Sequence, residues 1–99
     1  MTQVFTKKED LELFDASLRK RLHARQEELK LSDKALGKMA FPYMANPIGK
    51  VQALFVGQGA GENRKPQTIR TSELVNLCEA LGLPWREVIR DAIKEVDDN

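Results

Sequence analysis

Apolar residues recur at helical spacing along the first third of the chain. The intervals between them are three, four, four and seven residues, which keeps them on one face of an α-helix, whereas a strand would alternate every second residue. This face consists of Leu11, Phe14, Leu18, Leu22 and Leu29. Thr6 and Glu9 have the spacing of a capping box. We therefore predict a first helix from about Lys7 to Lys30.

Two shorter helices are predicted from their start signals. Ser32 is a favourable N-cap for a second helix over residues 33–40, with Ala35, Leu36 and Met39 directed inward. Asn46 followed by Pro47 predicts the start of a third helix over residues 47–56, because proline at the first helical position loses only an unpaired amide. Its apolar face is formed by Ile48, Val51, Leu54 and Phe55.

The last third of the chain predicts two more helices. Thr71 or Ser72 is expected to cap the fourth, which ends at about Leu81 before Gly82, and Pro84 opens the fifth. The apolar stripes are Leu74, Leu77, Cys78 and Leu81, then Val88, Ile89, Ala92, Ile93 and Val96. The expected fold is all-α, five helices in a single domain over residues 1–99, with a flexible arm at 1–5 and a flexible tail at 97–99.

Chain length, cysteine content and charge limit the classes of protein to which this chain can belong. A chain of 99 residues is long enough for one core, and its one cysteine, Cys78, excludes an internal disulfide. The net charge is only +1, but residues 71–99 hold three basic against seven acidic side chains. Residues 41–70 hold four basic side chains against one acidic side chain. The middle of the chain therefore favours a polyanion and the end repels one.

Residues 41–61 are almost free of charge, since Lys50 is their one ionisable side chain apart from Tyr43. Opposite Val51 and Phe55, the helix at 47–56 carries Gly49, Lys50, Gln52 and Ala53. A small, neutral, amide-bearing face suits insertion into the major groove of DNA. The alternative is that this helix is simply the most buried one. The basic run 19–21 is expected to form a solvated face, with Asp15 pairing with Arg19.

The segments 31–39, 51–57 and 74–83 together resemble the helix-turn-helix domain of the lambda repressor family. They read LSDKALGKM, VQALFVG and LVNLCEALGL. The resemblance covers about residues 6–96 and implies that the helix at 47–56 lies in the major groove, with the start of the second helix on the phosphate backbone. The connection between these two helices is about four residues longer than the tight turn typical of the family.

Carried over by position, the resemblance implies a set of DNA contacts. Phosphate contacts are implied for Ser32, Asp33 and Lys34, and contacts with phosphate or the minor groove for Arg64, Lys65 and Gln67. The implied reading face is Ile48, Gly49, Lys50, Gln52 and Ala53. Because Ile48 and Gly49 stand where relatives have Gln or Ser, we expect more of the readout to fall to Lys50, Gln52, Tyr43 and Asn46, or to the shape of the DNA.

These observations predict a small cytoplasmic regulator of transcription, a phage- or plasmid-type repressor that binds double-stranded DNA as a homodimer. An alternative left open is a protein-interaction module, such as an adaptor, antitoxin or antirepressor, that docks through residues 41–56 with Phe41, Tyr43 and Met44. No catalytic grouping is recognisable, so an enzyme is not expected. Neither a cofactor, a metal, a small-molecule ligand nor a membrane segment is expected.

Overall fold

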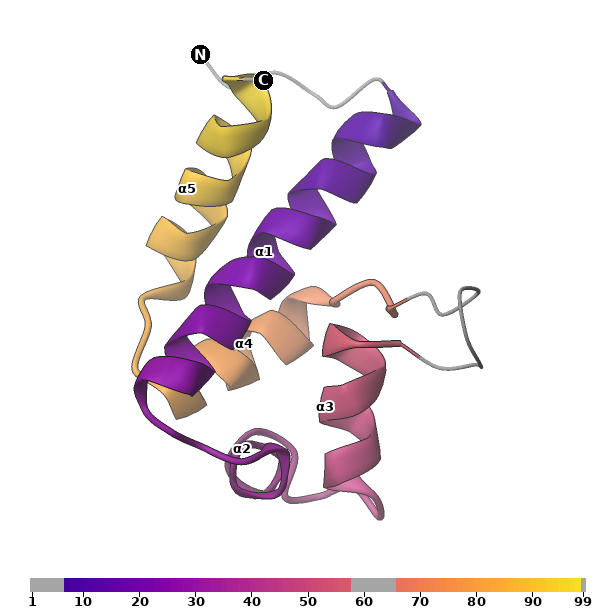
Figure 1. The fold of residues 1–99 in the computed structure, drawn as a ribbon, viewed down its shortest axis with the longest axis vertical. Helices are drawn as coiled ribbons and strands as arrows, with labels where there is room; N and C mark the ends of the chain where they lie inside the picture. Colours follow the sequence, from indigo (N-terminus) through magenta and orange to yellow (C-terminus); the bar gives the residue numbers. More distant parts are fainter. Residues whose placement is uncertain (1–6, 58–65, 99) are drawn as a thin grey trace.

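The computed structural model describes residues 7–57 and 66–98 of the chain. These residues form five α-helices and no strand (Figure 1). The helices are α1 (Lys8–Glu28), α2 (Asp33–Ala40), α3 (Pro47–Phe55), α4 (Thr71–Leu81) and α5 (Trp85–Asp97). The expected all-α class is confirmed. Helix α5 includes Asp97, the first residue of the expected tail at 97–99, and Asp98 is its C-cap.

The ends of α1 differ in part from the sequence prediction. Lys7 is the N-cap and makes no side-chain capping bond, while Thr6, expected to cap, lies outside the described residues. At the other end the Leu31 amide donates to the Gln26 carbonyl at 3.1 Å, which closes the helix after Leu29. Lys30 adopts a left-handed conformation with φ of 56° in this closure.

The starts of α2 and α3 form as predicted from local signals. The Ser32 hydroxyl accepts a hydrogen bond from the Ala35 amide at 3.0 Å, and the Asn46 side-chain oxygen accepts one from the Gly49 amide at 3.0 Å. Each bond satisfies one of the amides that a helix start leaves without an intrahelical acceptor. Pro47 is the first residue of α3, as expected.

The expected cap of α4 is wrong by one or two residues. Arg70, and neither Thr71 nor Ser72, is the N-cap, because the Glu73 carboxylate reaches back to accept from the Arg70 amide at 2.9 Å. Gly82 ends α4 with φ of 68°, and the Leu83 amide donates to the Cys78 carbonyl at 2.8 Å. Thus α4 closes with the same turn as α1, but with glycine at the left-handed position.

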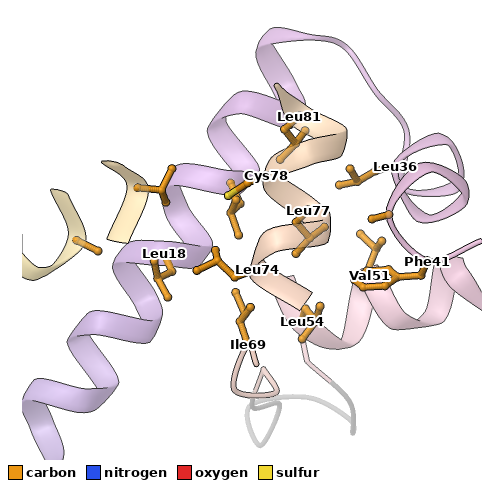
Figure 2. Packing of buried hydrophobic residues seen from close by; sticks show 14 residues of the cluster. Leu18, Leu36, Phe41, Val51, Leu54, Ile69, Leu74, Leu77, Cys78 and Leu81 are labelled. Atoms are coloured by element: carbon orange, nitrogen blue, oxygen red, sulfur yellow. The ribbon is translucent and has the colours of Figure 1, made fainter. Parts of the chain in front are cut away.

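The core is organised around α4. Figure 2 shows Leu74, Leu77, Cys78 and Leu81 between Leu18 of α1 on one side and the side chains of α2 and α3 on the other. Those facing side chains are Leu36, Phe41, Val51 and Leu54. Ile69 closes the same core from the segment before α4, a contribution that the sequence pattern did not predict. Burial raises the pKa of the Cys78 thiol to about 11.

Three apolar residues expected in the core are exposed. Leu11 and Leu29 are 50% and 41% exposed, because the first turns of α1 rise above α3 and α4 (Figure 1) and Leu29 is already the C-cap. Met39 is 53% exposed. The buried side of α2 is centred on Leu36, Gly37 and Ala40, and Met39 projects about 100° away from it.

Candidate nucleic-acid interface

The start of α3 lies directly against the middle of α2. A Cβ atom added to Gly37 would lie 2.8 Å from both the carbonyl carbon and the carbonyl oxygen of Pro47. That separation is shorter than any ordinary van der Waals contact, so only glycine allows this approach. The two helices therefore form a closely packed pair whose mutual orientation is fixed by backbone contact.

Of the three residues expected at the start of α2, only Lys34 makes no hydrogen bond or ion pair with another described residue. Ser32 uses its hydroxyl to cap the helix. The half-buried Asp33 carboxylate accepts from the Gln26 side-chain amide at 2.9 Å, and the same amide donates to the Leu31 carbonyl at 3.1 Å. Gln26, which sequence reasoning missed, is buried and ties α1 to the start of α2. Lys34 is exposed.

The expected reading face of α3 is only partly exposed. Gln52 is exposed, and Ile48 and Gly49 are half-buried. Ala53 is only 2% exposed, so its expected place on the outer face is wrong. The reason is the segment before α4, which folds back along α3 so that the Gln67 amide donates to the Ala53 carbonyl at 2.9 Å.

Lys50 is not the free cation that the sequence suggested. Its ammonium group lies 2.5 Å from the Glu73 carboxylate and donates to the Gln67 side-chain oxygen at 3.1 Å. The side chain is 16% exposed. Burial opposes ionisation of Glu73, but the hydrogen bonds from Lys50 and from the Arg70 amide outweigh it and lower the pKa of Glu73. Expecting Lys50 on the outer face was wrong, because it joins α3 to α4.

Gly49 and Asn46 contact each other at the start of α3. A Cβ atom on Gly49 would overlap the side-chain amide of Asn46, which is held there by its capping bond. A side chain at position 49 would therefore displace the Asn46 amide from its capping position. Asn46 is exposed, but its oxygen is already committed to the Gly49 amide.

The remaining expected contacts fall in three places. Tyr43, in the connection between α2 and α3, is 72% exposed and accepts from the Asn76 side chain at 3.3 Å. Gln67 is exposed at the surface beside Lys50. Arg64 and Lys65 lie outside the described residues, so their expected phosphate contacts stay predictions.

The basic run of α1 is used inside the protein rather than as a solvated face. Arg19 donates to the Leu54 carbonyl at 2.7 Å, where α3 ends, and Arg21 lies 2.7 Å from the Glu95 carboxylate of α5. Both arginines are half-buried, so that part of the expectation is wrong. Lys20 is exposed and lies 3.6 Å from Glu95. A guanidinium group at a helix C-terminus also meets the negative end of the helix dipole.

A second lysine, which the sequence analysis did not single out, lies close to Lys34 on α2. Lys38 lies one turn further along α2 and is exposed. From the direction in which Gly37 faces Pro47, Lys34 and Lys38 project about 60° and 100° round the helix, to the same side. The two cations therefore border the start of α3. The i, i+4 spacing of the two lysines was the signal that could have identified the pair.

The chain matches no protein-family model, no curated protein and no solved structure. Among residues 7–57 and 66–98, no helix combines the length and apolarity needed to cross a membrane. Within the same ranges, no three His, Cys, Asp or Glu side chains are grouped in a way that could hold a metal ion.

Proposed function

We propose that this protein binds double-stranded DNA through α2 and α3 and regulates transcription, with the lambda repressor-like arrangement that its sequence resembles. The observation that carries the proposal is the distribution of charge around α3. Its outward side holds Ile48, Gly49 and Gln52 and no ionised side chain, and Lys34 and Lys38 border its first turn. A neutral face flanked by cations suits a groove lined by phosphates.

The rigid contact between Gly37 and Pro47 supports the same proposal. A reading helix needs a fixed angle to the helix that sits on the backbone, because base contacts depend on placing side chains accurately. In this arrangement the start of α2 lies on phosphate and α3 enters the major groove. The protein acts by occupancy, as a dimer on two half-sites about 34 Å apart.

Charge reversal on α2 tests the proposal. The double variant Lys34→Glu, Lys38→Glu is compared with Arg90→Glu, Lys94→Glu on α5, which has the same spacing and the same change in net charge. We expect the α2 variant to weaken duplex binding at least about ten-fold and to lower the salt slope by about two. Fluorescence anisotropy over a salt series, with both variants folded by circular dichroism, measures this.

The control decides how the result is interpreted. If the α5 variant weakens binding as much as the α2 variant, the effect comes from net charge and the α2–α3 surface is not the site. If the folded wild type enriches no duplex from a randomised library, the proposal is wrong. A recovered palindrome supports both the regulator and the dimer.

A second candidate function is favoured by the connection between α2 and α3. Met39, Tyr43 and Met44 are 53%, 72% and 36% exposed, a grouping of large apolar side chains that suits a protein partner. Phe41, expected among them, is fully buried and is not available. Under this alternative, the double variant Met39→Ser, Tyr43→Ser no longer binds the protein partner. Reversing the charges of Lys34 and Lys38 has little effect on that binding.

A further inference from the structure

Gln52 is set apart from the other amide side chains that the structure describes. The side chains of Gln26, Asn46, Gln67 and Asn76 all take part in hydrogen bonds within the protein. Gln52 is exposed, and within residues 7–57 and 66–98 its side-chain amide has no hydrogen-bond partner. As far as the described residues are concerned, its donor and its acceptor are both available to a ligand.

The neighbours of Gln52 on the same side of α3 are apolar or lack a side chain. Ile48 and Val56 lie one turn before and one turn after it, and Gly49 lies three residues before it. Val56, the C-cap residue, is 51% exposed, and Ile48 is half-buried. The outward side of α3 is therefore one free amide between two aliphatic side chains.

The ion pair between Lys50 and Glu73 keeps the cation of α3 away from this side. Lys50 is about 160° round the helix from Gln52, and its ammonium group is occupied by Glu73 and by Gln67. Guanine in the major groove is read by a cationic Arg or Lys side chain. That chemistry is absent from the outward side of α3 in the described structure.

We infer that Gln52 is the base-reading side chain and that the protein reads A·T pairs. This inference rests on the proposed function. The glutamine amide matches the N6 donor and N7 acceptor of adenine in the major groove, and the methyl groups of Ile48 and Val56 match the thymine methyl. The ligand is thus a duplex with A·T pairs where α3 enters the groove.

Base analogues separate this readout from an effect of groove shape. Three mixed-sequence duplexes of equal length are compared, with A·T, G·C or inosine·cytosine pairs. Inosine·cytosine presents the major groove of G·C but lacks the amino group that distinguishes G·C in the minor groove. We expect the A·T duplex to bind about ten-fold more tightly than the other two. Replacing thymine by deoxyuridine in the A·T duplex, which removes the methyl group, should weaken binding a few-fold.

The variants Gln52→Ala and Gln67→Ala identify the reading side chain. Both glutamines are exposed, but the Gln67 amide is already engaged by Lys50. We expect Gln52→Ala to bring A·T binding down to the G·C level and Gln67→Ala to keep the preference. Anisotropy titrations at one salt concentration, with thermal melts of each variant, measure both.

Each outcome has a distinct meaning. Absence of binding to all three duplexes by the folded protein contradicts the proposed function as well. Equal binding to A·T and G·C contradicts only the inference. Tight binding to inosine·cytosine assigns the preference to the minor groove and overturns the role of Gln52. Loss of preference in Gln67→Ala to the same degree as in Gln52→Ala overturns it too.

Discussion

The α1–α5 pair and the α2–α3 pair are held together by different chemistry. Between α1 and α5, the Ser17 hydroxyl and the cations of Lys20 and Arg21 converge on the carboxylate of Glu95. Between α2 and α3, Gly37 lies against Pro47, and no ion pair joins the two helices in the described structure. The polar contacts of the first pair involve ionised side chains, whereas the close approach of the second pair depends on the absence of a side chain.

The two pairs of helices also use their basic side chains differently. On the α1 side, Arg21 is directed to Glu95, and Arg19 and Arg25 donate to the carbonyls of Leu54 and Leu81 at the ends of α3 and α4. These cations are used for packing and are not available to a polyanion. The α2–α3 contact uses no ionised side chain, and Lys34 and Lys38 have no ion-pair partner among the described residues.

The largest expected effect is on the α2–α3 contact. Gly37→Ala adds a methyl group against backbone atoms that cannot rotate away, so the helices must separate. Although alanine favours helix by about 1 kcal/mol, overpacking exceeds this, and we expect a net loss of about 2 kcal/mol in the free energy of unfolding. Urea denaturation measures it, with Lys38→Ala in the same turn as a control near zero. A gain in stability for Gly37→Ala would contradict the close contact.

A smaller effect is expected for the ion pair that joins α3 to α4. Glu73→Gln keeps an acceptor for the Arg70 amide but removes the charge beside Lys50, so we expect a loss of about 1–2 kcal/mol. Because the pKa of Glu73 is lowered in the folded state, its contribution is present above the ordinary glutamate pKa and is lost as pH falls through the lowered value. Urea denaturation of wild type and variant from neutral pH to about pH 3 tests this.

Glu95→Gln is the matched comparison in the α1–α5 pair. The hydrogen bond from Ser17, followed by the charges of Lys20 and Arg21, lowers the pKa of Glu95 as well. The Glu95 side chain is 35% exposed and that of Glu73 is 11% exposed, so salt should reduce the effect of Glu95→Gln more than that of Glu73→Gln. Equal salt sensitivity of the two variants would contradict the difference in burial.

The smallest effects are expected at the two helix ends that close in the same way. Lys30 and Gly82 both have positive φ, at 56° and 68°. Since glycine adopts this conformation without a Cβ clash, Lys30→Gly should raise the free energy of unfolding by up to about 1 kcal/mol. Gly82→Ala should lower it by about 1 kcal/mol. Thermal or urea denaturation of both variants measures this, and changes of the same sign would contradict a shared closure.

Local signals predicted the fold better than the site. The caps at Ser32, Asn46 and Gly82 depend on chemistry within three or four residues, and they formed as expected. The orientations of Lys50 and Ala53 depend on residues 66–73, which fold back onto α3 from a distant part of the sequence. A helical period assigns a face to each residue but does not say what covers that face.

The buried thiol of Cys78 reports how often the core of the folded protein opens. With a pKa of about 11 and a fully buried side chain, Cys78 is closed to a thiol reagent until α4 separates from its neighbours. The labelling rate therefore measures how often the core opens, without any introduced probe. A duplex that binds only the folded state should slow that labelling in proportion to its occupancy, which gives an assay for ligands that needs no knowledge of where they bind.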